Sequence, residues 1–348
     1  SRVADGLHGH GLDPSGSGLL RERVAAHLSA HQQLPTSADQ IVVTAGAQQG
    51  LSLLAAAAGS ASVAITACPT YPGLASAFPG RRKRLVPVPG DGSGGVDPAA
   101  LARACRKAEN GVVYVAPTGH NPTGSVMPLP RREAVIDAAR SSGLLVIEDL
   151  SLADLVLDDD ISVPPPLSAL DDHVVAVGST SKLLWAGLRV GWVRAPEPLR
   201  ASLVRAKAAA DLASSVPAQL LAAEILGRVD SGWLAQLRAA LAIRRDSLAA
   251  LLAERLPAWR VRRLPAAGLS LWVELPLGDA DAFAHAAARY GVTVAPGRTM
   301  CSDGGHVNCV RISFAEQVDV LDLAVDRLAA AWEVHSEDLA ATPMVAGR

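Results

Sequence analysis

Lysine and aromatic residues are scarce in this chain of 348 residues. Phe, Trp and Tyr together make up 3% of it, and arginine supplies nearly all of the positive charge. The four lysines are Lys83, Lys107, Lys182 and Lys207. We expect three of them to be exposed, because they lie among charges or on outer helical faces. Lys182 alone follows a turn of small polar residues and precedes the apolar residues 183–185.

No strong excess of charge and no long apolar run is present. The net charge is −2, which gives no basic surface for nucleic acid. Every apolar stretch of membrane-spanning length contains a charge or a helix breaker, and the first residues have no signal-peptide pattern. We therefore expect a cytoplasmic globular protein that binds small molecules, with no membrane and no nucleic acid bound by this chain itself.

Cysteine is also rare, with four residues and no CxxC pair. This pattern predicts free, reduced thiols in an intracellular protein. The spacing of Cys301, His306 and Cys309 loosely suggests zinc, but a fourth ligand is lacking. We expect no metal site.

Short apolar runs alternate with helical patterns over the first two thirds of the chain, which predicts an α/β fold with a mainly parallel sheet. Expected strands are 41–44, 63–66, 112–116, 144–148, 174–177 and 190–194, with helices at 47–58, 98–108 and 131–142. The glycine-rich residues 90–95 indicate a turn better than a dinucleotide-binding loop, since Pro98 interrupts the following pattern.

The pattern changes after about residue 196. Helices are expected at 196–228, with an interruption near Pro217, and at 233–255, 280–290 and 317–332, with strands at 269–275 and 310–314. We predict a large α/β domain over residues 20–205. A smaller α+β domain would combine residues 1–19 and 206–348.

Residues that could bind a ligand or take part in catalysis lie at the ends of several predicted strands. Gly46, Ala47 and Gln48 lie where strand 41–44 meets a helix, and free amides at a helix start favour a phosphate. Asp149 follows strand 144–148, at the edge where open α/β sheets place ligands. Ser179, Ser181 and Lys182 follow strand 174–177.

Two arginines complete this pattern. Arg189 lies seven residues after Lys182, and Arg311 stands inside an apolar strand, where a charge needs a partner. Each feature alone has a common structural explanation, such as a helix cap for Asp149 or an ion pair for Arg311. Together they supply an amine for a Schiff base, a carboxylate for a ring nitrogen, a phosphate site and a carboxylate-binding arginine. Pyridoxal 5′-phosphate (PLP) requires this set.

Two segments carry a family resemblance. Residues 117–124, Pro-Thr-Gly-His-Asn-Pro-Thr-Gly, are similar to the Asn-Pro-Gly signature of class I and II aminotransferases, which are fold-type I PLP enzymes. Residues 179–191, with Ser-x-Ser-Lys followed by Gly-Leu-Arg-x-Gly, resemble that family's Schiff-base motif. The resemblance covers about residues 13–332 and implies the fold-type I architecture, a seven-stranded-type sheet flanked by helices.

The resemblance also implies roles for individual residues. Lys182 would hold PLP as a Schiff base, Asp149 would contact the pyridine nitrogen, and Tyr71 would stack on the ring. These three form the expected catalytic set. Asn121 would contact the ring oxygen, and Arg311 together with Asn121 would bind the substrate. The remaining expected cofactor contacts are Gly46, Ala47, Gln48, Ser151, Ser179, Ser181 and Arg189.

Within the family, residues 44–51 and 267–272 resemble the aminotransferase-like domain of MocR-type GntR regulators. Those regulators carry an N-terminal winged helix-turn-helix, which this sequence does not show. The family also implies a homodimer acting on an amino acid and a keto acid.

Two family tyrosines are replaced: one by Ser151 or Leu152, the other in the segment 10–14. The family resemblance still implies an aminotransferase, but these replacements speak against ordinary transamination, and two alternatives are left open. One is another PLP reaction, namely elimination, decarboxylation, oxidation or carbon–carbon bond formation. The other is the effector-sensing domain of a regulator.

Overall fold

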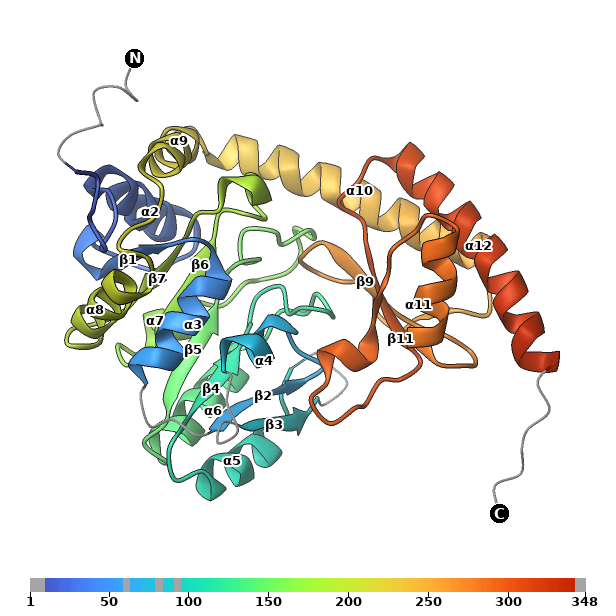
Figure 1. The fold of residues 1–348 in the computed structure, drawn as a ribbon, viewed down its shortest axis with the longest axis horizontal. Coiled ribbons are helices and arrows are strands. Elements are labelled where there is room, and N and C mark those ends of the chain that lie inside the picture. Colours follow the sequence, from blue (N-terminus) through green and yellow to red (C-terminus); the bar gives the residue numbers. More distant parts are fainter. Residues whose placement is uncertain (1–9, 59–62, 79–83, 91–94, 342–348) are drawn as a thin grey trace.

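Two sheets of different size organise the chain (Figure 1). The computed structural model describes residues 10–58, 63–78, 84–90 and 95–341. The large sheet has seven strands in the order β1-β7-β6-β5-β4-β2-β3. Its strands are β1 (Ile41–Thr44), β2 (Val63–Cys68), β3 (Arg84–Pro89), β4 (Gly111–Val115), β5 (Leu145–Asp149), β6 (Val175–Ser179) and β7 (Gly191–Arg194). Only β7 runs antiparallel to its neighbours in this sheet, so the predicted mainly parallel, seven-stranded sheet is confirmed.

Helices cover both faces of the large sheet, which explains why its central strands are apolar throughout. Alternate residues of β4 show the two faces: Val112 and Tyr114 pack in one core, and Val113 and Val115 in another. Around this sheet lie α2 (Gly18–His31), α3 (Ala47–Ala57), α4 (Gly73–Ala77), α5 (Pro98–Lys107), α6 (Leu129–Arg140), α7 (Leu167–Leu170), α8 (Leu199–Asp211) and α9 (Val216–Leu226). Short 3-10 turns are η1 (Ala38–Gln40) and η2 (Ala186–Leu188).

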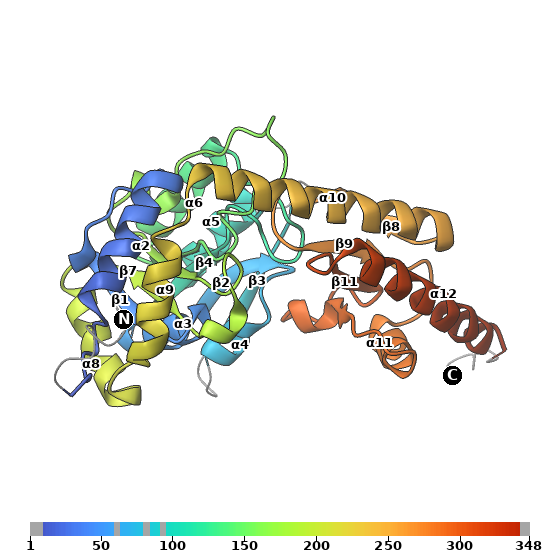
Figure 2. The same cartoon turned by 90° about the horizontal axis from the view of Figure 1, so that it is seen from above.

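The small domain is built on a four-stranded antiparallel sheet, in the order β10-β11-β9-β8. It consists of β8 (Arg260–Val261), β9 (Ser270–Glu274), β10 (Ala295–Pro296), β11 (Cys309–Ser313), α11 (Ala280–Arg289), α12 (Val318–Ala341) and η3 (Gly297–Met300). Trp259, Phe283 and Trp332 pack edge to face in its core. Helix α10 (Ser231–Arg255) runs from the large domain into the small one in both views (Figures 1 and 2).

The predicted elements are largely found, with differences at the edges. The helical stretch expected at 196–228 is two helices, α8 and α9, and it breaks at Leu212, whose φ is +65°. Helix α9 packs against α2 beside the large sheet. Helix α2 and the strands β3, β8 and β10 were not predicted, and residues 91–94 of the predicted glycine-rich turn lie outside the described residues. No helix among the described residues has the length and apolar character needed to cross a membrane.

Two predictions about single side chains are wrong. Lys207 is buried rather than exposed, and its Nζ lies 2.5 Å from Asp211 Oδ1. Cys68 and Cys301 form a disulfide rather than two free thiols, while Cys105 and Cys309 are free and buried. The disulfide joins residues 233 positions apart, a separation that a search for nearby cysteine pairs does not detect.

Candidate active site

A cavity of about 190 Å³ lies at the carboxyl edge of the large sheet, the place where α/β folds bind ligands. It collects residues that follow five different strands, since Gly46, Tyr71, Asn121, Asp149 and Ser179 come after or end β1, β2, β4, β5 and β6. The predicted residues that line it are Gly46, Ala47, Gln48, Tyr71, Asn121, Asp149, Ser151, Ser179, Ser181, Lys182 and Arg189. Arg311, the one remaining predicted residue, is not among the lining residues but forms a hydrogen bond with Asn121, which is.

The carboxylate of Asp149 is buried and held by two donors. The amide of Ser151 donates to Oδ1 at 2.8 Å, and the hydroxyl of Tyr114 donates to Oδ2 at 2.7 Å. Burial raises the pKa of Tyr114 well above its usual value, and the neighbouring charge of Asp149 adds to that shift. Tyr114 therefore stays protonated and keeps donating.

Lys182 follows β6 and has access to solvent through the cavity. Partial burial lowers the pKa of its amine, and the positive charges of Arg311 and Arg189 lower it further. A lowered pKa increases the neutral fraction of the amine, which is the nucleophilic form. The preceding turn is ordered by Ser179, whose hydroxyl donates to Ser181 Oγ at 2.8 Å.

An anion cradle adjoins Lys182 at the start of α3. Gly46 precedes this helix with φ +105°, a conformation that favours glycine. A β-carbon at Gly46 would lie 3.0 Å from Arg189 Nη2, so a side chain there would crowd the guanidinium. Arg189 Nη2 donates to Ala45 O at 2.7 Å, which holds the guanidinium against the helix start. Helix amides and a guanidinium together suit a phosphate.

Tyr71 is held by Gln48, which lies in the first turn of the same helix, α3. Its hydroxyl donates to Gln48 Oε1 at 3.0 Å, and Gln48 Nε2 donates to Gly73 O at 2.8 Å. A β-carbon at Gly73 would overlap both Gln48 Oε1 and the Tyr71 ring. Any residue other than glycine would therefore displace these two side chains. Burial raises the pKa of Tyr71, and Asp149 contributes to the shift.

Arg311 brings a positive charge from β11 of the small domain to this edge. Its Nη1 donates to Asn121 Oδ1 at 2.9 Å, and no carboxylate among the described residues pairs with it. Burial lowers the pKa of Arg311, as expected for a guanidinium without a counter-charge. The guanidinium of Arg311 is therefore available to an anionic ligand, and a substrate carboxylate could bind it by a bidentate contact.

The loop that carries Asn121 is held in place by hydrogen bonds from Arg132. This side chain is fully buried and donates to Met127 O at 2.9 Å and to Thr118 Oγ1 at 2.8 Å. Burial lowers its pKa to about 10. Neither Arg132 nor Tyr114 was predicted from the sequence. A hydroxyl or guanidinium at a core position is the signal that could have indicated them, since such a group needs a partner.

The donor set fits PLP. An amine, a carboxylate and an anion cradle face one cavity, which Ser151 also lines, and the Oγ atom of this residue is buried without a hydrogen-bond partner among the described residues. A buried polar atom of this kind normally has a partner, so a ligand oxygen would satisfy it.

Residues 7–328 match the family described as aminotransferase class I and II. This chain belongs to the class I and II aminotransferase family, whose members use PLP. It is 30% identical to 2-aminoadipate transaminase of Thermus thermophilus over 80% of this chain and 71% of that protein. The structure of LysN, the α-aminoadipate aminotransferase of the same species in complex with N-(5′-phosphopyridoxyl)-L-leucine, matches with a TM-score of 0.85 and 28% identity. It covers 96% of this chain and 87% of LysN.

Regulators are among the relatives as well. The chain is 32% identical to the uncharacterised HTH-type transcriptional regulator YisV of Bacillus subtilis over 87% of its own length. It spans 62% of the length of that regulator.

Proposed function

We propose that this chain is a PLP-dependent aminotransferase acting on an α-amino acid and a keto acid. The observation that carries the proposal is the meeting of Lys182 and Asp149 in one cavity, with Arg311 bonded to Asn121 at its side. When bound, PLP supplies an aldehyde that condenses with amines and a ring that accepts the electron pair released at the substrate α-carbon.

The residues of the chain divide the work as their positions suggest. Lys182 Nζ would hold the cofactor through its aldehyde and would also accept the α-proton of the substrate, a role that its lowered pKa favours because more of the amine is neutral. Asp149, oriented by Tyr114, would hold the ring nitrogen in its protonated form. Arg311 would bind the substrate carboxylate and so orient the bonds of the substrate α-carbon.

The phosphate and ring oxygen have separate partners. We assign the phosphate to the start of α3 at residues 46–48, to Arg189 and to the hydroxyls of Ser179 and Ser181. We assign the ring oxygen to Asn121 and Ser151, and stacking on the ring to Tyr71. The amide oxygen of Asn121 is already engaged by Arg311, which leaves its NH₂ group to donate.

A turnover assay tests the reaction type. The purified protein is given single amino acids with a keto acid acceptor, and transamination predicts a new amino acid and a new keto acid in equal amounts. Lys182→Ala should abolish both. Release of ammonia, carbon dioxide or hydrogen peroxide in place of a new amino acid would assign elimination, decarboxylation or oxidation instead, and would refute transamination.

A second function is favoured by the match to YisV, which covers most of this chain. In that case the chain would be the effector-sensing part of a regulator and would bind PLP and an amino acid without turnover. Binding of an amino acid with a spectral change but no product, for every acceptor in the panel, would support this function against the first.

We also propose that the protein is a cytoplasmic homodimer. Trp185, three residues after Lys182, is 66% exposed, and Leu212 is 59% exposed. Large apolar side chains in solvent often mark an interface. Light scattering that shows an active monomer would contradict the dimer.

A further inference from the structure

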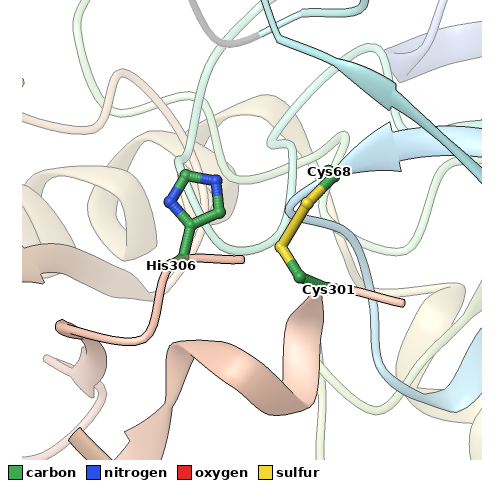
Figure 3. A group of neighbouring side chains, drawn as sticks. All are labelled: Cys68, Cys301 and His306. Carbon is green, nitrogen blue, oxygen red and sulfur yellow. A yellow bond between two sulfur atoms is a disulfide. The ribbon is translucent and has the colours of Figure 1, made fainter. Parts of the chain in front are cut away.

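Three side chains of types that can bind a metal ion lie close together between the two domains, and one of them, Cys68, is three residues before Tyr71. Cys68 ends β2 of the large sheet, Cys301 follows η3, and His306 lies in the loop that leads to β11. Figure 3 shows the imidazole of His306 beside the two sulfur atoms. The ligand atoms of all three lie within 4.8 Å of one another. In the structure the two cysteines form a disulfide, with their Cα atoms 5.3 Å apart.

A carboxylate also lies against this cluster. Asp303 Oδ1 is 3.4 Å from Cys68 Sγ, and the amide of Gly305 donates to the same oxygen at 2.9 Å. A disulfide sulfur has no proton, so oxidised Cys68 cannot donate to this carboxylate. A thiol would donate to it, and a cation on the sulfurs would attract it. The position of Asp303 therefore suits the reduced cysteines better than the disulfide.

We propose that the reduced cluster binds Zn²⁺ between the domains, with Cys68, Cys301 and His306 as its protein ligands and Asp303 as a nearby carboxylate that the ion would attract. Thiolate, imidazole and carboxylate are the ligands that zinc takes in tetrahedral sites, and thiolates disfavour Mg²⁺ and Ca²⁺. The disulfide is the oxidised, metal-free state of the same residues, because cysteine binds a metal ion as the thiolate and not as a disulfide.

The fold replaces one member of the ligand set that the sequence spacing suggested. Cys301, His306 and Cys309 alone left a ligand missing, and Cys68 reaches the group from 233 residues away. Cys309 contacts the imidazole, with its Sγ 3.9 Å from His306 Nδ1, but it is not among the mutually close ligand atoms. We therefore assign Cys68, and not Cys309, to the metal.

The change from disulfide to metal site needs only a dithiol reductant. Two thiol–disulfide exchanges break the Cys68–Cys301 bond, convert both sulfurs to thiols and leave the dithiol as a disulfide. Zn²⁺ then displaces the two thiol protons, which pass to solvent. The backbone segments next to Cys68 and Cys301 are already hydrogen-bonded to each other, since the amide of Thr70 donates to Met300 O at 2.8 Å. A bound ion would hold the segment that carries Tyr71 to the domain that carries Arg311.

The test uses PLP-loaded protein kept reduced throughout, with zinc measured after removal of excess metal and Co²⁺ titrated as a spectroscopic probe. Reduced wild type should retain one Zn²⁺ per chain, and Co²⁺ should give the strong visible bands of tetrahedral thiolate coordination. Protein oxidised to the disulfide should retain none. Cys68→Ser and Cys301→Ser should lose binding, and His306→Ala should weaken it by at least about 10-fold.

Cys105→Ser and Cys309→Ser are matched controls, since each removes a free buried thiol outside the proposed ligand set. Both should bind as wild type does. The proposal fails if reduced wild type takes up no metal, if uptake persists in Cys68→Ser, or if Cys309→Ser abolishes it. Thermal unfolding of every variant separates loss of a ligand from loss of the fold, and His306→Ala provides the test should a cysteine variant not fold.

Discussion

Tyr114 donates a 2.7 Å hydrogen bond to Asp149, and this pair links the core of the large sheet to the cavity. Asp149 ends β5, and Tyr114 lies on the neighbouring strand β4, so the geometry of the bond follows from strand pairing. The carboxylate that we assign to the ring nitrogen is thus positioned by a buried residue outside the family motifs.

Tyr114→Phe removes this bond and leaves the ring in place. A hydrogen bond to a charged group contributes about 1.5–3 kcal/mol, so we expect PLP to bind roughly 10- to 100-fold more weakly. Titration of the apoprotein with PLP measures the change. Tyr290→Phe, at the end of α11, is the control and should bind as wild type does. Equal affinities for Tyr114→Phe and wild type would show that Tyr114 does not position Asp149.

Ser151→Ala tests a hydroxyl that has no hydrogen-bond partner in the described part of the chain. Because no bond is lost in the apoprotein, its unfolding midpoint should not fall. The affinity for PLP should fall by about 2- to 10-fold if the hydroxyl meets a cofactor oxygen. Ser214→Ala is a matched control, since Ser214 Oγ is likewise buried without a partner but does not line the cavity. A similar loss in both variants would remove Ser151 from the site.

Gly46→Ala tests the anion cradle. The positive φ makes a side chain cost of the order of 1–3 kcal/mol in stability, and the new methyl would press on Arg189. Gly143→Ala has the same kind of strain, with φ +65° and no atom within 4 Å of its β-carbon. Both variants should unfold at lower temperature. Only Gly46→Ala should bind PLP and inorganic phosphate more weakly, and an unchanged phosphate affinity there would argue against the cradle.

The lowered pKa of Lys182 predicts how cofactor attachment depends on pH. The neutral amine reacts, so the rate of PLP capture should rise with pH and level off around a pKa below the ordinary 10.5. Arg311→Gln removes one of the nearby positive charges and should move this midpoint upward, whereas Arg228→Gln, at an exposed position just after α9, should not. Stopped-flow absorbance follows the capture. A midpoint at or above 10.5 in wild type would contradict the electrostatic account.

Local patterns in the sequence predicted the sheet and the cavity residues at its strand ends, and the family resemblance added Tyr71 and Asn121. Strand ends place Gly46, Asp149 and Ser179 at one edge whatever the details of packing. Tyr114 was missed because a tyrosine in an apolar strand looks like any core residue until its neighbour is known. The Cys68–Cys301 disulfide and the burial of Lys207 depend on contacts between separate elements, which sequence spacing does not report.

The central claim is that Lys182 attaches the cofactor, and the scarcity of lysine makes it directly measurable. Borohydride reduction of the PLP-loaded protein fixes the cofactor to the amine that holds it, and peptide mass spectrometry then locates it among the four lysines. We predict the label on Lys182 alone, with a visible absorption band before reduction that Lys182→Ala lacks. A label on Lys83, Lys107 or Lys207, or an unchanged band in Lys182→Ala, would contradict the account.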